Sequence, residues 1–177
     1  MPVILLRHTR PAIAPGICYG RSDLEPGPDF EAASAAVVAG LPPVARVVTS
    51  PLRRARLLAE RVATARGLAL EEDARIAEID FGRWEGVAWA SIPRIELAAW
   101  AADFHGARPH GGENLTMLAE RVGAALGDVE PSDPPTLWVC HSGVVRAACA
   151  LLDQGDRWRT ELDFGGWLDL ASATSGR

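Results

Sequence analysis

Two histidines and an arginine stand where short apolar runs end, and these residue types suit phosphate chemistry. Arg7 and His8 follow the run 3–6, and His141 follows the run 137–140. Guanidinium groups match phosphate oxygens, and imidazole can act as a nucleophile or an acid near neutral pH. One histidine at a strand end is more often a structural hydrogen-bonding group. Two at separate strand ends, one beside an arginine, favour a phosphate site.

Further candidates lie at the starts of two expected helices. Arg53, Arg54 and Arg56 follow the short apolar run 46–49. Only one face of a helix can point into a site, so we expect two of these arginines to be exposed, although spacing does not say which. Ser142 would open a later helix, whose free backbone N–H groups are further donors for an anion.

The spacing of apolar residues predicts strands alternating with helices. We expect strands at 3–6, 46–49, 137–140 and 166–170, with one or two short ones in 68–80, and helices at 29–41, 50–66, 94–103, 115–127 and 144–152, with Ser50 as N-cap of the second. Strands that alternate with helices indicate right-handed crossovers and an α/β fold. We expect a three-layer α/β/α sandwich with a mostly parallel sheet, which residues 1–177 form as one domain. Ligands of such sheets bind at the carboxyl ends of the strands, where the candidate residues gather.

Composition excludes several classes of protein. All 18 basic residues among the 177 are arginine, so lysine-dependent phosphate loops and Schiff-base chemistry are absent. The chain has no HExxH, CxxC, GxSxG or GxGxxG motif, and we expect no metal and no cofactor. The net charge of −5 argues against nucleic acid or an anionic membrane as a partner. The first apolar run is too short for a signal peptide or a membrane span, so we expect a cytoplasmic protein.

Five segments, in order along the chain, resemble the histidine phosphatase (phosphoglycerate mutase-like) superfamily. They are LRHTRP at 6–11, SPLRRA at 50–55, EIDFGRWEG at 78–86, GGE at 111–113 and VCHSGVVR at 139–146. The resemblance implies that His8 is a nucleophile that takes the phosphoryl group, while Arg7, Arg54 and His141 hold its oxygens, with Ser142 beside them. Glu78 would protonate the leaving oxygen and then activate water. The positive neighbours should keep His8 neutral, as a nucleophile must be.

Other polar residues near these segments have structural interpretations. We expect Asp80 and Glu85 to make turn or loop contacts, and Glu113 either to brace a loop or helix or to contact substrate. His105 and His110 are expected to be solvated. Asn114 stands where the family usually has serine after Gly-Gly-Glu.

The segment PGICYGRSD at 15–23 is similar to the α-ribazole-5′-phosphate phosphatase branch of the superfamily, and the region 84–113 resembles that branch as well. This resemblance implies α-ribazole 5′-phosphate as substrate, in cobalamin nucleotide-loop assembly, with Tyr19 and Arg21 as substrate-binding residues. In any case the partner would be a small phosphorylated metabolite. Exposed tryptophans such as Trp158 or Trp167 could mark a homodimer contact.

Three alternatives stay open at this point. Residues 140–146 match CxxGxxR, the phosphate loop of cysteine-based phosphatases, which would make Cys140 the nucleophile. That motif lacks its usual flanking residues and leaves Arg7, His8 and Arg54 unexplained. The second alternative is a mutase, although mutases of this superfamily are longer. The third is a phospholigand-binding protein of the same fold without catalysis.

Overall fold

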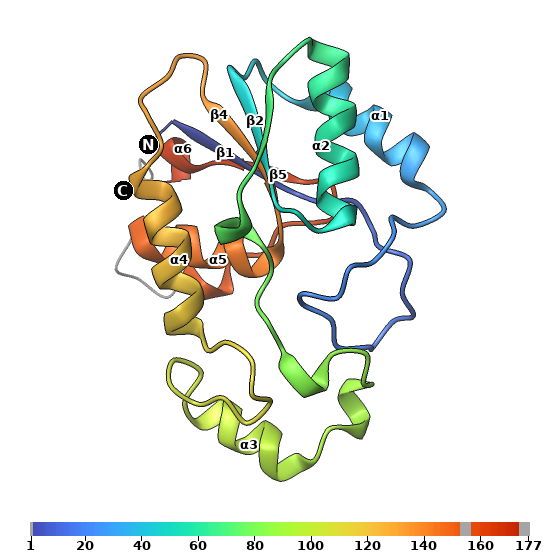
Figure 1. Cartoon of the computed structure of the whole chain (residues 1–177), viewed down its shortest axis with the longest axis vertical. Coiled ribbons are helices and arrows are strands. Elements are labelled where there is room, and N and C mark those ends of the chain that lie inside the picture. Colours follow the sequence, from blue (N-terminus) through green and yellow to red (C-terminus); the bar gives the residue numbers. More distant parts are fainter. Residues whose placement is uncertain (1, 153–156, 174–177) are drawn as a thin grey trace.

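A five-stranded sheet forms the centre of the computed structural model, which describes residues 2–152 and 157–173 (Figure 1). The strands are β1 (Val3–Arg7), β2 (Arg46–Thr49), β3 (Leu70–Glu72), β4 (Thr136–Cys140) and β5 (Trp167–Asp169). Their order is β3-β2-β4-β1-β5; β5 is antiparallel to β1 and the other neighbours are parallel. The predicted mostly parallel sheet is confirmed.

Helices cover both faces of this sheet, as Figure 1 shows. They are α1 (Phe30–Gly40) and α2 (Arg53–Arg66) on one face and α4 (Leu115–Gly127) and α5 (Ser142–Leu152) on the other, with α3 (Arg94–Ala102) apart and α6 (Leu170–Ala173) after β5. Alternate side chains of a strand point to opposite faces. Accordingly, Ile4 and Leu6 are buried in the cluster with α1 and α2, while Val3 and Leu5 pack with α4 and α5. The three-layer α/β/α sandwich is confirmed.

The start of α2 differs from the prediction. The helix begins at Arg53 with Leu52 as its N-cap, so the expectation that Ser50 caps it is wrong. The Ser50 hydroxyl instead lies 2.7 Å from Nε2 of His141 and accepts the backbone N–H of Leu52 at 3.2 Å. This contact joins Ser50 to a histidine at another strand end, and no local pattern in the sequence records it.

Residues 81–112 form an extension beyond the sheet, built from short 3-10 turns and α3 (Figure 1). Its interior is aromatic: Trp84 is buried, and Trp89 and Trp100 pack against it. His110 is buried there, 4.8 Å from Trp84 between ring centroids, and its Nδ1 accepts the N–H of Gly112. The expectation that His110 is solvated is therefore wrong, because this aromatic cluster encloses it. His105 is exposed as expected.

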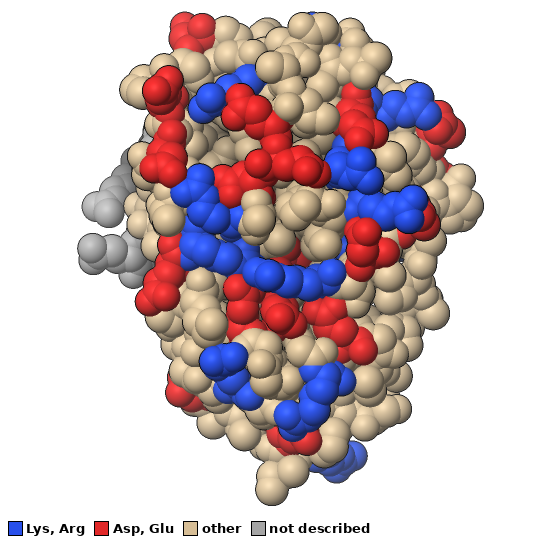
Figure 2. All heavy atoms as spheres, viewed as in Figure 1, with Lys and Arg blue, Asp and Glu red and all other residues tan. Residues whose placement is uncertain are grey.

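Arginine and acidic side chains are interspersed over the face drawn in Figure 2, where a row of arginines crosses the middle between acidic side chains. No helix among residues 2–152 and 157–173 is long and apolar enough to cross a membrane.

Candidate active site

Four of the predicted site residues lie at the carboxyl ends of β1, β2 and β4: Arg7, His8, Arg54 and His141. His8 follows β1 and His141 follows β4, and the two strands pair in parallel register. The imidazole rings lie 5.1 Å apart between centroids. Two histidines separated by 133 positions of sequence thus share one site, because parallel pairing brings their strand ends to the same edge.

His8 is buried with one ring nitrogen fixed by the backbone. Its Nδ1 lies 2.6 Å from the carbonyl oxygen of Thr9, which can only accept a hydrogen bond, so Nδ1 carries the proton. Nε2 then holds a lone pair, and Nε of Arg54 donates to it at 3.3 Å. Burial, followed by the charge of Arg54, lowers the pKa of His8 to about 3. The ring is neutral at physiological pH, and Nε2 can act as a nucleophile once an incoming anion takes the place of its contact with Arg54.

Arg54 is the inward-facing arginine of α2. It is completely buried, and besides His8 it donates to the carbonyl oxygens of Ser22 at 2.6 Å and Gly20 at 2.7 Å. Arg53 is exposed and Arg56 is partly exposed, and both form ion pairs with acidic residues at the surface. The expectation that two of these three arginines point to solvent is confirmed.

Arg7 brings a second guanidinium to the site. Its Nη1 donates to the carbonyl oxygen of Leu162 at 2.6 Å, and its guanidinium carbon lies 3.9 Å from the centroid of the Phe164 ring. Its Nε is buried without a hydrogen-bond partner among the residues that the structure describes. Burial lowers the pKa of Arg7 from its ordinary value. A partly buried guanidinium with an unused donor is suited to an incoming anion.

His141 also has an unused donor or acceptor. Its Nε2 contacts the Ser50 hydroxyl, whereas Nδ1 is buried and has no partner within the described part of the chain. Burial, followed by the charge of neighbouring His8, lowers the pKa of His141 well below its ordinary value. A neutral ring beside His8 avoids repulsion between two imidazolium groups.

The Glu78 carboxylate faces the same site and is 8% exposed. Its two oxygens accept the backbone N–H of Gly143 at 3.1 Å each, and Oε1 also accepts that of Ile79 at 2.9 Å. A Cβ atom at position 143 would lie 2.2 Å from Oε1, which the site cannot accommodate without moving the carboxylate. The glycine after Ser142 therefore permits the close approach of Glu78 to the start of α5.

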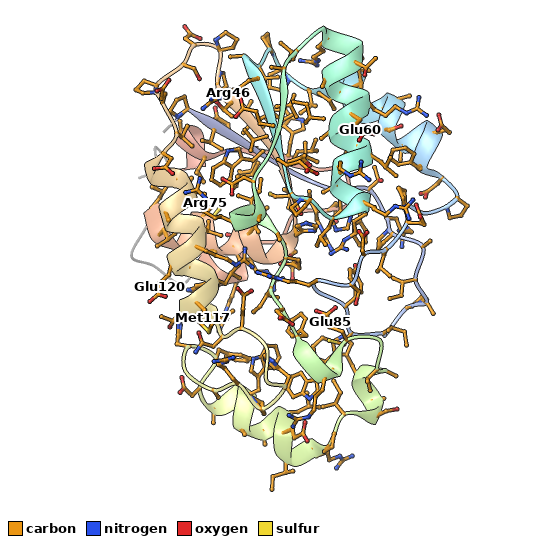
Figure 3. The ribbon with its side chains drawn as sticks, viewed as in Figure 1. Arg46, Glu60, Arg75, Glu85, Met117 and Glu120 are labelled. Atoms are coloured by element: carbon orange, nitrogen blue, oxygen red, sulfur yellow. The ribbon has the colours of Figure 1, made fainter. Side chains whose placement is uncertain are left out.

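The other acidic candidates make loop contacts. Asp80 accepts the N–H of Gly82 at 2.7 Å, and Glu85 accepts the N–H of Arg21 and Phe81. Glu85 lies between the N-terminal loop and the aromatic extension (Figure 3). These contacts agree with the structural interpretation of both residues.

Glu113 braces the loop before α4. It accepts the N–H of Asp80 at 3.1 Å and pairs with Arg121 at 2.8 Å. Asn114 caps α4 by accepting the N–H of Met117, a role that serine also fills, which explains the departure from the family pattern.

A pocket of about 680 Å³ opens beside His8 and Glu78, and the buried Arg54 and His141 are not among the residues that line it. Arg7, His8, Glu78 and Ser142 line it, as does Tyr19. Arg21 does not line this pocket: its Nη2 pairs with Oε1 of Glu113 at 3.2 Å, and the structure does not bring it to the candidate site.

Sequence reasoning missed other lining residues, above all Arg146, together with Leu115, Leu118 and Arg159. The signal for Arg146 was present, since it lies four positions after Ser142 on the same face of α5.

Comparison with known families agrees with this arrangement. The family model described as the histidine phosphatase superfamily (branch 1) matches residues 3–173. The chain belongs to this superfamily. Among the part of the chain that the structure describes, no group of three or more His, Cys, Asp or Glu side chains could hold a metal ion.

Relatives in the superfamily include named phosphatases. The chain is 32% identical over 136 residues to the glucosyl-3-phosphoglycerate phosphatase of Mycobacterium tuberculosis, covering 69% of this chain and 60% of the relative. It is 31% identical over 112 residues to phosphoserine phosphatase 1 of Hydrogenobacter thermophilus, covering 60% of this chain and 53% of the relative. The chain thus spans little more than half the length of these relatives. A solved structure of mycobacterial glucosyl-3-phosphoglycerate phosphatase superposes with a TM-score of 0.81 at 25% identity, covering 93% of this chain and 87% of the other.

Cys140, the alternative nucleophile, is not available for attack. It ends β4, pairs in register with Arg7 and has no exposed surface. Burial raises the pKa of its thiol, so the reactive thiolate is disfavoured. The CxxGxxR match therefore does not form the phosphate loop of a cysteine-based phosphatase.

The buried His8 should make stability depend on pH. Its pKa is about 3 in the folded protein and near the ordinary 6.5 when unfolded, so the unfolded chain binds more protons between these values. The free energy of unfolding should then fall as the pH drops below 6.5, by about 1.4 kcal/mol per pH unit from this residue. Urea denaturation at pH 7, 6 and 5 measures it: His8→Gln should flatten the dependence, whereas His105→Gln, at an exposed position, should not. Equal slopes in wild type and His8→Gln would contradict the assignment.

Proposed function

We propose that this protein is a metal-independent phosphomonoester hydrolase that works through a phosphohistidine on Nε2 of His8. The observation that carries the proposal is the state of His8: neutral, with Nδ1 held by the Thr9 carbonyl and Nε2 facing a site that contains Arg7 and Arg54. A neutral imidazole supplies the electron pair, and the surrounding guanidinium groups stabilise the charge of a transferring phosphoryl group.

In the first step, Nε2 of His8 attacks phosphorus while the bond from phosphorus to the ester oxygen breaks. Arg7, Arg54 and Nδ1–H of His141 hold the phosphoryl oxygens, and the start of α5 at Ser142 adds backbone donors. Protonated Glu78 gives its proton to the leaving oxygen, so the alcohol departs neutral. The Nδ1–H bond to Thr9 stabilises the positive charge that the ring gains.

In the second step, water attacks phosphorus and the N–P bond breaks. Glu78, now ionised, takes a proton from the water, and His8 recovers its lone pair as phosphate leaves. The carboxylate returns to its protonated form, so the cycle balances with one ester and one water consumed. The position of Glu78, held by the N–H of Gly143 on the wall of the same pocket, supports both of its roles.

Two substrates are supported by different observations. α-Ribazole 5′-phosphate carries a flat ring system, and Trp100, Phe104 and Trp158 supply an aromatic wall on which such a ring could stack. A phosphorylated hydroxy acid is favoured by the names of the relatives, glucosyl-3-phosphoglycerate phosphatase and phosphoserine phosphatase. In both cases the substrate is a small phosphorylated metabolite.

A phosphate-release screen tests the proposal. Protein treated with EDTA is offered p-nitrophenyl phosphate, α-ribazole 5′-phosphate, sugar phosphates, O-phosphoserine and 3-phosphoglycerate. We expect release of phosphate that added EDTA does not reduce. Tight binding of the esters without turnover would instead support a non-catalytic phospholigand-binding protein. Conversion of 3-phosphoglycerate to its 2-phospho isomer without phosphate release would support a mutase.

A further inference from the structure

Arg146 brings a guanidinium group to the pocket, and the proposed phosphoryl transfer does not use this group. It lies on α5, one helical turn after Ser142, and lines the same pocket as Arg7 and Glu78. Its Nε donates to the carbonyl oxygen of Thr160 at 3.2 Å, which fixes the base of the guanidinium. Within residues 2–152 and 157–173, neither Nη1 nor Nη2 has a hydrogen-bond or ion-pair partner. The open end of a fixed guanidinium is a preorganised anion site.

The charges of the pocket leave Arg146 without a counterion. Two carboxylates, from Glu78 and Asp103, also lie on this wall, and within the described residues neither forms an ion pair with Arg146. Arg146 is close enough to Arg7 for its charge to add to the effect of burial in lowering the pKa of Arg7. Repulsion between two partly buried cations is relieved when anions bind to both. A phosphoryl group at His8 would pair with Arg7 and leave Arg146 without an anion.

The position of Arg146 indicates where a second anion would lie. Residues four apart on a helix are separated by slightly more than one turn, or about 6 Å along the axis. With the phosphoryl group at the start of α5 beside Ser142, a partner of Arg146 would lie in the same pocket, about one helical turn away from that group. One guanidinium matches one carboxylate in a bidentate pair, whereas the phosphoryl site itself gathers two arginines and two histidines.

We propose that Arg146 binds a carboxylate of the leaving group, so that the natural substrate is the phosphate ester of a hydroxy acid. This inference rests on the proposed hydrolase function and selects between its two substrates, since α-ribazole 5′-phosphate has no carboxylate. The pocket of about 680 Å³ is in the range that holds drug-sized ligands. The hydroxy acid can therefore carry a further group, which Phe104, Leu115 and Trp158 would contact.

The test compares two esters with the same three-carbon skeleton, 3-phosphoglycerate and glycerol 3-phosphate, which differ only in carboxylate against hydroxymethyl. We expect the wild type to favour 3-phosphoglycerate by roughly 10- to 100-fold in kcat/KM, as for a hydrogen-bonded charge pair. Arg146→Gln should bring the ratio of the two kcat/KM values close to one. Arg146→Lys, which keeps the charge but not the bidentate geometry, should give an intermediate ratio. Arg94→Gln, an exposed arginine outside the pocket, should keep the wild-type ratio.

Three outcomes would overturn the inference: equal kcat/KM for both esters in the wild type, an unchanged ratio in Arg146→Gln, or faster hydrolysis of α-ribazole 5′-phosphate than of 3-phosphoglycerate. Hydrolysis of p-nitrophenyl phosphate, which has no carboxylate, reports on the proposed function separately. If this ester is hydrolysed and no carboxylate preference exists, only the assignment of Arg146 fails. If no ester is hydrolysed, the hydrolase proposal fails, and calorimetric binding of the same two esters to wild type and Arg146→Gln still decides the carboxylate preference. Thermal unfolding of each variant shows whether it is folded.

Discussion

Replacing His8 with alanine is expected to lower phosphate release from p-nitrophenyl phosphate by about 10⁴-fold or more, as when the nucleophile of a covalent mechanism is removed. The physical reason is that the partners of His8, a carbonyl at Nδ1 and a guanidinium N–H at Nε2, leave the lone pair of the ring on Nε2. Arg7 and Arg54 remain in the variant, so binding of inorganic phosphate should survive. Initial rates and phosphate inhibition constants measure both effects.

Cys140→Ser is the matched control for His8→Ala. Cys140 lies next to His141 but is buried in the sheet, and serine is close to it in size. We expect this variant to retain most of the activity and to form an acid-labile phosphoenzyme that His8→Ala does not form. Activity that disappears with Cys140→Ser and persists in His8→Ala would reverse the assignment of the nucleophile.

Replacing Glu78 with glutamine is expected to slow hydrolysis of alkyl phosphates by roughly 10²- to 10⁴-fold, the usual contribution of a general acid. The loss should be much smaller for p-nitrophenyl phosphate, because a nitrophenolate leaves readily without a proton. Glutamine keeps the shape of Glu78 and a carbonyl oxygen for the Gly143 N–H. The ratio of kcat on glycerol 3-phosphate to kcat on p-nitrophenyl phosphate is the measurement. Equal losses on both esters would argue that Glu78 has a structural role instead.

Gly143→Ala provides an independent test of the same carboxylate. The added Cβ would meet Oε1 of Glu78 at 2.2 Å, so the carboxylate must move although its chemistry is unchanged. We expect the same preference for the aryl ester as in Glu78→Gln, with a smaller loss. Gly123→Ala on α4 is the control, because its Cβ would meet Leu151 at an ordinary 3.5 Å. A Gly143→Ala enzyme with wild-type ratios would contradict the placement of Glu78.

Local patterns in the sequence were sufficient to predict the fold and the site residues that lie at the ends of strands. The apolar runs before Arg7 and His141 had the composition of buried strands, and parallel pairing then brought both histidines together. The pattern could not choose among the three arginines of α2, because the rotation of that helix depends on packing against the sheet. It misplaced His110, whose burial arises from aromatic residues up to 29 positions away in sequence.

Arg146 shows a different limit. Its spacing from Ser142 was visible, and it ends both the second histidine motif and the cysteine-phosphatase match, but neither pattern gave it a contact with substrate. Its place in the pocket depends on the carbonyl of Thr160, which belongs to the segment after α5. Likewise, Ser50 suggested a helix cap from its neighbours alone, whereas its partner proved to be His141, 91 positions away. Tertiary contacts of this kind leave no periodic signal.

Arg54 donates hydrogen bonds to the carbonyls of Gly20 and Ser22, so the N-terminal loop helps to position this guanidinium in the site. Gly20 has no room for a side chain: a Cβ there would lie 1.9 Å from the carbonyl oxygen of Ile79, the neighbour of Glu78. Gly20→Ala would therefore displace two backbone segments together: the one whose carbonyl holds Arg54 and the one at Ile79, whose N–H holds Glu78. A substitution at Gly20, which does not line the pocket, would then have an effect like that of replacing both Arg54 and Glu78.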